Sequence, residues 1–260
     1  LPPAVNKANV RGMDLCWLRY LCVDKNTPSF RVVFFLILFG SVLCRVRPGA
    51  EGRNQGVKMT DVFSFSAVIG QDAMRKALLL AGINPAIGGV LIIGEKGTAK
   101  STAVRSFGAC MKRDIVTLPL GITEDRLVGS IDMERTMAEG RTSFQPGLFQ
   151  QAHGSILYVD EVNLLQDHIT DILLEVSANK MNRIQREGIS FSHPSDFLLI
   201  GTMNPEEGPL RPHFLDRFSL AVSVESAKDT DVRMAIVRNR LAYEESPRDF
   251  RRKYDRLDER

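Results

Sequence analysis

Short apolar runs alternate along this chain with longer stretches in which apolar residues recur at helical spacing. The run GGVLIIG is bounded by glycines and rich in β-branched residues, which is typical of a buried parallel strand. The stretch DHITDILLEVSAN places its apolar residues on one face of a helix. The predicted strands cover residues 88–94, 114–120, 155–161, 196–204 and 219–225. The predicted helices cover residues 70–84, 100–111, 167–179 and 229–245.

Strands that alternate with helices of this length predict an α/β fold, a parallel five-stranded sheet with helices on both faces. Residues 59–246 contain the whole pattern, and we expect them to form one domain. The tail, SPRDFRRKYDRLDER, is highly charged. We expect residues 247–260 to be a solvated helix or a frayed end.

The leader, residues 1–58, differs from the rest of the chain. Its apolar run at residues 32–44 is shorter than the roughly 20 residues a spanning helix needs, so we expect no stable membrane insertion. A signal-peptide core is an alternative, although no clear small-residue cleavage site follows. We expect the leader to lie outside the working domain, with a short apolar helix at most, and Met59 offers a natural start.

Charge and cysteine content narrow the functional classes. The leader has nine Lys/Arg against three Asp/Glu, whereas residues 59–260 have 25 against 28, so the main body has no basic footprint for nucleic acid. No CxxC pair occurs, and the cysteines predict neither disulfides nor zinc in a reducing, cytoplasmic setting. The histidines lack the spacing of metal ligands, and each is expected to be a surface or loop residue: His153, His168, His193 and His213.

A phosphate-binding loop is predicted between the strand at 88–94 and the helix that follows it. The segment GEKGTAKST fits the pattern of glycine, four residues, glycine, lysine and serine or threonine, except that Ala99 replaces the second glycine. Such a loop directs backbone N–H groups and the positive end of a helix dipole at one point, which favours phosphate. The expected ligands are ATP and Mg²⁺. The candidate nucleotide-binding residues here are Gly94, Glu95, Lys96, Gly97, Thr98, Ala99, Lys100, Ser101 and Thr102.

Ala99 adds a methyl group where the backbone passes close to phosphate. We expect it to be tolerated on the ground that it begins a helix, in which alanine is favourable.

Two carboxylates follow the apolar strand SILYVDE. Ligands of open parallel sheets bind beyond the carboxyl ends of the strands, so Asp160 and Glu161 should face the phosphate loop. In this arrangement Asp160 and Ser101 would hold Mg²⁺, and Glu161 would polarise the attacking water. The alternative is a pair of acids in a turn at the end of a strand.

Two further polar residues could complete a hydrolytic site. Asn204 ends the strand at 196–204 and could orient the water, or it could simply form a turn before Pro205. Arg217 precedes the last strand and is either a surface charge or an arginine finger supplied across a subunit interface, with Arg211 as a second candidate.

These elements, in this order, resemble the AAA+ P-loop ATPases, and the amino-acid sequence of the motifs indicates one family among them. VIGQDAMRKALLLAGINPAIGGVLIIGEKGTAKST, GSILYVDEVNLL and GTMNPEEGPLRPHFLDRF are similar to the ATPase subunit, subunit I, of magnesium chelatase and of its cobalt-chelatase relatives. The resemblance covers roughly residues 60–250 and excludes the leader.

The resemblance implies a ring-forming ATPase motor without a metal-insertion site of its own. Similar subunits form hexamers, pair with a second ATPase-like subunit, and act on a large catalytic subunit that places Mg²⁺ into protoporphyrin IX. Carried over to this chain, Lys100 and Ser101 are Walker A, Asp160 and Glu161 are Walker B, Asn204 is sensor 1 and Arg217 is the finger. The residues implied beside the adenine are Val68, Ile69 and Gly70.

Two insertions also match the family. Residues 128–146 fit a hairpin inserted in the second helix, and residues 182–196 read as two strands around a turn at Glu187 and Gly188, ahead of sensor 1. Plain connecting loops are the alternative, although long loops inside compact domains are uncommon. The family's C-terminal helical lid is expected to be absent, with residues 247–260 as its start.

The function expected is an ATP-hydrolysing motor subunit of a magnesium or cobalt chelatase. A related AAA+ chaperone for metal-cofactor assembly is an alternative, and so is a nucleotide-binding regulatory subunit that does not hydrolyse ATP. Lys100, Asp160, Glu161, Asn204 and Arg217 are all present, which disfavours the last of these.

Overall fold

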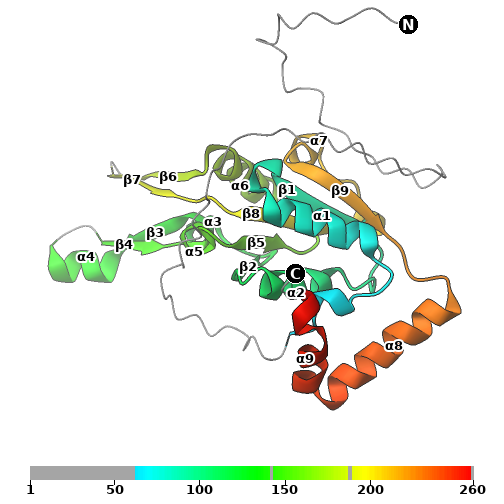
Figure 1. The fold of residues 1–260 in the computed structure, drawn as a ribbon. Helices are drawn as coiled ribbons and strands as arrows, with labels where there is room; N and C mark the ends of the chain where they lie inside the picture. The colour runs from blue at the N-terminus through cyan, green and yellow to red at the C-terminus, as the bar shows by residue number, and fades with distance from the viewer. Residues whose placement is uncertain (1–61, 141–142, 187–188, 259–260) are drawn as a thin grey trace, which may run out of the picture.

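The computed structural model describes residues 62–140, 143–186 and 189–258 (Figure 1). The apolar run of the leader and Met59 lie outside the described residues. Within the described parts of the chain, no helix combines the length and the apolar character needed to cross a membrane.

A five-stranded sheet forms the centre of the domain. All its strand pairs are parallel and their order is β2-β5-β8-β1-β9, so the predicted α/β sheet is confirmed. The strands are β1 (Gly89–Gly94), β2 (Ile115–Leu118), β5 (Ile156–Val159), β8 (Leu198–Met203) and β9 (Phe218–Val224). Their carboxyl ends lie at one edge of the sheet.

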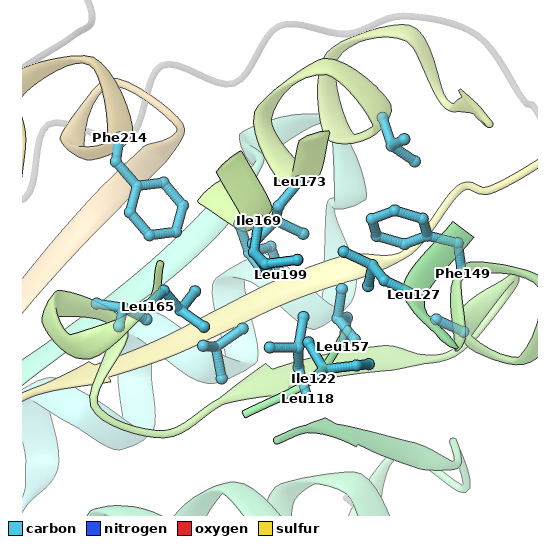
Figure 2. Packing of buried hydrophobic residues seen from close by; sticks show 14 of the residues in the cluster. Leu118, Ile122, Leu127, Phe149, Leu157, Leu165, Ile169, Leu173, Leu199 and Phe214 are labelled. Atoms are coloured by element: carbon cyan, nitrogen blue, oxygen red, sulfur yellow. The ribbon is translucent and has the colours of Figure 1, made fainter. Parts of the chain in front are cut away.

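Helices cover both faces of this sheet, because successive strand residues point to opposite sides. Ile156, Tyr158 and Ile200 pack with α1 (Asp72–Ile83) and α2 (Lys100–Cys110) on one face. Leu157 and Leu199 pack on the other face, where Figure 2 shows them close to Ile169 and Leu173 of α6. The helices on this second face are α3 (Glu124–Val128), α5 (Leu148–Ala152), α6 (Asp167–Asn179) and α7 (Pro212–Leu215). Short 3-10 turns connect the elements: η3 (Phe65–Ala67), η4 (Pro85–Ile87), η5 (Val162–Leu164) and η6 (Pro205–Glu207).

Both predicted insertions form antiparallel strand pairs that extend to the same side of the domain (Figure 1). The second consists of β6 (Met181–Arg186) and β7 (Ile189–Pro194), and the turn between them lies outside the described residues. The first pairs β3 (Gly129–Asp132) with β4 (Ser143–Pro146), but it is not a simple hairpin. A short helix, α4 (Met133–Glu139), stands between its strands, and the Asp132 side chain caps it by accepting from Arg135 N.

A buried hydrogen-bonded cluster joins the two insertions near their bases. Asn182 of β6 uses both amide hydrogens: Nδ2 donates to Val128 O at 2.8 Å and lies 2.9 Å from His193 Nε2. His193 is therefore buried in a strand, and the expectation that it is a surface or loop residue is wrong. Further out, the rings of Phe144 and Phe191 stack with centroids 4.1 Å apart.

The chain then continues as two helices, α8 (Thr230–Glu245) and α9 (Pro247–Asp258). The tail is a helix, but it is not fully solvated, because Phe250 is buried against Phe63 and Tyr243. Asp258 also accepts from Ser66 N at 2.8 Å, which fixes α9 to η3. The charged composition predicted a helix surrounded by solvent, but one aromatic residue, Phe250, anchors one side of it to the domain.

Candidate nucleotide-binding site

Apart from the two arginines, the polar residues singled out from the sequence gather at the carboxyl edge of the sheet. The phosphate loop leaves β1 at Gly94, Asp160 and Glu161 follow β5, and Asn204 follows β8. Strands β5, β8 and β1 are neighbours, so these three chain segments lie side by side. The structure therefore brings together the residues predicted to meet there.

The loop itself is a tight turn into the first turn of α2. Gly94 has no room for a side chain, because a Cβ atom there would lie 2.5 Å from Val224 O of the adjacent strand. Gly97 has a φ of +86°, and a Cβ at this position would meet nothing within 4 Å, so the loop is open on that side. The first N–H groups of α2 have no partner within the helix and face the loop. This shape suits a phosphate group.

The reason expected for the tolerance of Ala99 does not hold. This residue precedes α2 rather than beginning it, and its backbone is left-handed, with φ 61° and ψ 21°. In this conformation Cβ crowds the backbone, at a cost of roughly 1–2 kcal/mol that glycine avoids. Helix propensity therefore does not explain the alanine at this position, and the loop keeps its turn at the expense of backbone strain.

Lys100 lies across the mouth of the loop. Its Nζ donates to Gly94 O at 2.5 Å and to Glu95 O at 2.8 Å. Burial lowers the pKa of Lys100 from its ordinary value, and the negative charges of Asp160, Glu161 and Glu207 oppose that shift. The ammonium group thus lies within the field of three carboxylates, where a phosphate could exchange for the carbonyl oxygens.

Ser101 and Asp160 are joined through a third side chain. The Tyr158 hydroxyl lies 3.1 Å from Ser101 Oγ and donates to Asp160 Oδ1 at 2.8 Å. Thr202 of β8 donates to the same carboxylate oxygen. Burial raises the pKa of Tyr158 to about 12, with the nearby Asp160 carboxylate acting in the same direction, so the phenol remains a donor at neutral pH. One carboxylate oxygen of Asp160 is therefore held on two sides.

Glu161 has an unusual backbone for a non-glycine residue, with φ 54° and ψ 57°. Such a conformation costs about 1–3 kcal/mol and persists only where neighbouring groups fix it. Here the backbone N–H donates to Thr202 Oγ1 at 3.2 Å. Thr202 thus positions both acidic residues at the end of β5.

Asn204 is buried beside these residues and also caps the next turn. Its Oδ1 accepts from Glu206 N at 3.3 Å, and its Nδ2 lies 3.4 Å from Glu206 Oε2. The turn-forming role weighed from the sequence is therefore present. Asn204 also lies at the candidate site, where the sensor role requires it, and that role stays a prediction.

The segment implied beside the adenine, Val68 to Gly70, reaches the same edge of the sheet. Gln71 Nε2 donates to Glu225 O, directly after β9, at 2.9 Å. A Cβ at Gly70 would lie 3.3 Å from Val232 of α8. The segment is thus held between the end of the sheet and α8, and contact with adenine stays a prediction.

Arg217 lies at the opposite edge of the sheet. It precedes β9, and its carbonyl accepts from Gly89 N at the start of β1, whereas the phosphate loop follows the other end of β1. The five residue steps of β1 separate the two ends by about 16 Å. Arg217 therefore cannot reach the loop of its own chain, and Arg211 is ion-paired with Asp167 at the start of α6.

Sequence reasoning missed four residues of this site: Tyr158, Asn163, Thr202 and Glu207. Tyr158 and Thr202 each interrupt an apolar strand two residues before a predicted site residue, and a period of two places them on the same face. That spacing was the available signal. Asn163 and Glu207 lie in turns, where no periodicity marks them.

The donor set fits a magnesium ion with a triphosphate. Mg²⁺ prefers oxygen ligands and is usually bound through one or two carboxylates together with substrate phosphates. Ser101 Oγ and Asp160 supply a hydroxyl and a carboxylate within one hydrogen-bonded group, and Lys100 supplies a cation beside them. These features define a P-loop nucleotide site in an α/β domain.

Comparison with known proteins agrees with this class. Residues 89–218 match the family model of the AAA domain, dynein-related subfamily. The chain is 40% identical over 243 residues to the magnesium-chelatase 38 kDa subunit of Rhodobacter capsulatus, covering 81% of this chain and 68% of that protein. It is 54% identical over 199 residues to an uncharacterised protein of Mycobacterium tuberculosis, covering 74% of this chain but only 32% of that protein.

A solved structure gives the same answer for the fold. The complex between subunits BchI and BchD of magnesium chelatase, from a cryo-electron microscopy reconstruction, contains a chain 40% identical to this one with a TM-score of 0.62. The match covers 76% of this chain and 72% of that one. The chain belongs to the AAA family of magnesium-chelatase ATPase subunits, the 38 kDa or ChlI subunits.

Proposed function

We propose that this chain is the ATP-hydrolysing motor subunit of a magnesium chelatase-type complex, in which a partner subunit inserts the metal into a tetrapyrrole. The observation that carries the proposal is the convergence of Lys100, Ser101, Asp160 and Glu161 at one edge of the sheet. The relatives named as magnesium-chelatase subunits support the choice of complex.

Each residue has a role that follows from its position. Lys100 would bind the terminal phosphates, because its ammonium group lies at the mouth of the loop. Ser101 and Asp160 would hold Mg²⁺, which when bound neutralises charge that develops on the phosphates. Glu161 would accept a hydrogen bond from the attacking water, and Asn204 would orient that water from the neighbouring strand.

Partners are part of the proposal. The solved BchI–BchD complex supports pairing with a second ATPase-like subunit, and Arg217 at the far edge of the sheet supports assembly with further copies of this chain, with a hexameric ring as the expected form. The large catalytic subunit would choose the metal and the tetrapyrrole.

Glu161→Gln tests the proposed hydrolysis. The amide keeps the size of the side chain but cannot act as a base, so ATP hydrolysis should fall by roughly 10²–10⁴-fold. ATP binding should remain, because Glu161 acts on water rather than on the nucleotide. Steady-state phosphate release and calorimetric titration with Mg·ATP measure the two effects.

The matched control is Glu175→Gln, which alters an exposed carboxylate on α6 and should leave both quantities unchanged. Undiminished hydrolysis in Glu161→Gln would overturn the role of Glu161. No binding of Mg·ATP by the unaltered chain would overturn the proposed function.

A further inference from the structure

The Tyr158 hydroxyl occupies the junction between the two candidate magnesium ligands. Tyr158 is 2% exposed, and its ring packs on the α2 side of the sheet. From there the hydroxyl contacts Ser101 Oγ and Asp160 Oδ1 at 3.1 and 2.8 Å. These two partners come from different segments, α2 and the turn after β5, so Tyr158 fixes their relative positions.

The hydrogens available at this junction determine how the groups are oriented. A phenol has a single hydrogen, and an ionised carboxylate can only accept. The Tyr158 hydrogen therefore goes to Asp160 Oδ1, which also accepts from Thr202. The contact between Tyr158 and Ser101 then requires the serine hydroxyl to be the donor, with the phenol oxygen as acceptor.

This orientation leaves particular lone pairs free. Ser101 Oγ donates its hydrogen to the Tyr158 oxygen, so a lone pair of Oγ remains free to bind a cation. Asp160 has Oδ1 occupied by two hydroxyl donors, and its side chain is otherwise exposed, so Oδ2 remains available. Mg²⁺ requires near-ideal octahedral geometry, and small errors in ligand direction are costly to its binding.

We propose that Tyr158 is a positioning residue for the magnesium ion of Mg·ATP, acting through Ser101 and Asp160 and assisted by Thr202. The inference rests on the proposed function. Residues that orient metal ligands in this way typically contribute 10- to 100-fold to metal affinity. Tyr158 itself does not touch the metal or the nucleotide.

The competing explanation is that Tyr158 only fills space in the core. Tyr158→Phe separates the two, because phenylalanine keeps the buried ring and removes only the hydroxyl. A packing role predicts no effect of this change on the contribution of Mg²⁺ to nucleotide binding. A positioning role predicts a loss that appears only when Mg²⁺ is present.

The experiment compares binding of ATP to the full chain in saturating Mg²⁺ and in EDTA, by calorimetric titration. In the unaltered chain Mg²⁺ should tighten binding. In Tyr158→Phe that gain should fall about 10-fold, while the Kd in EDTA changes less than about twofold. Thr202→Val removes the other donor to Asp160 Oδ1 at similar size and should reduce the same gain.

Thr170→Val provides a matched control, because the Thr170 hydroxyl is buried and donates to O of Gln166, the N-cap residue of α6, away from the site. It should leave the gain from Mg²⁺ unchanged. A full gain in Tyr158→Phe, with binding intact, would overturn the inference and leave the proposed function standing, and a full gain in Thr202→Val alone would remove Thr202 from it. Absence of Mg·ATP binding in the unaltered chain would overturn both.

Discussion

Two residues of the candidate site, Ala99 and Glu161, have left-handed backbones, and they differ in how that conformation is supported. The Glu161 backbone N–H is held by Thr202, which also holds Asp160, so its strain is coupled to the placement of both acids. Ala99 is exposed at the entrance to α2. Its strain follows from a methyl group at a position that favours glycine.

Ala99→Gly should therefore stabilise the domain. Glycine removes roughly 1–2 kcal/mol of left-handed strain but gains freedom in the unfolded chain, which leaves a net increase of about 0.5–1 kcal/mol in the free energy of unfolding. Urea denaturation followed by circular dichroism measures the change. The control is Ala242→Gly within α8, where the same substitution should lower stability by about 1 kcal/mol. A loss of stability in Ala99→Gly would contradict the assignment of strain.

At this scale the sequence predicted which residues would meet but not how they are held. Lys100, Ser101, Asp160 and Glu161 were predictable because each follows a buried strand or begins a helix in a recognisable pattern. The roles of Tyr158 and Thr202 depend on side-chain directions across neighbouring strands. Those directions follow from the β5–β8 register, Tyr158 opposite Ile200, which a single sequence does not specify.

At the scale of elements, the two insertions behave as one structural unit. Asn182 and His193 join the base of β6–β7 to Val128, at the start of the first insertion, and Phe144 stacks on Phe191 further out. The β6–β7 pair lies in the connection between β5 and β8, the two strands that carry Glu161 and Asn204. The joined insertions therefore connect directly to the candidate site.

Asn182→Ala should loosen this junction. It leaves Val128 O and His193 Nε2 without their buried donor, at a cost of about 1–3 kcal/mol in the free energy of unfolding. Hydrogen exchange should accelerate in β6 and β3 before it does so in the central sheet. Gln185→Ala, which removes an exposed amide from the same strand, should change stability by less than about 0.5 kcal/mol. Equal exchange in both variants would show that Asn182 does not join the insertions.

The five parallel strands and their helices were predictable because their apolar periodicity is strong. Helix α4 was not, since MERTMAE is short and depends on local capping by Asp132. The packing of α9 was also missed, because a charged helix anchored by Phe250 has the same composition as a free one. The first failure concerns a local cap and the second a contact between α9 and a segment distant from it in the sequence.

At the scale of the whole molecule, the phosphate loop and Arg217 lie at opposite edges of the sheet. If Arg217 supplies its charge to a neighbouring copy, Arg217→Ala and Lys100→Ala should each reduce hydrolysis, the former by roughly 10³–10⁵-fold. The Arg217→Ala variant retains an intact phosphate loop, and the Lys100→Ala variant retains the arginine. Head-to-tail contact between copies is the arrangement that would bring the two edges together.

Mixing the two inactive variants tests this arrangement. Subunits of Arg217→Ala should receive an arginine from Lys100→Ala neighbours, and an equal random mixture should recover up to about a quarter of the unaltered rate. The double variant, mixed with Arg217→Ala, should recover nothing. Failure of the first mixture to regain phosphate release, with assembly intact, would exclude action of Arg217 across an interface.

The opposed positions of Gly94, at the end of β1, and Arg217, just before β9, also bear on incomplete assemblies. An open, head-to-tail row of copies always has one phosphate loop at its end with no arginine from a neighbour. In the smallest assembly, a dimer, only half of the nucleotide sites would therefore be active. Specific activity per chain would then climb with protein concentration and level off only once the row closes on itself.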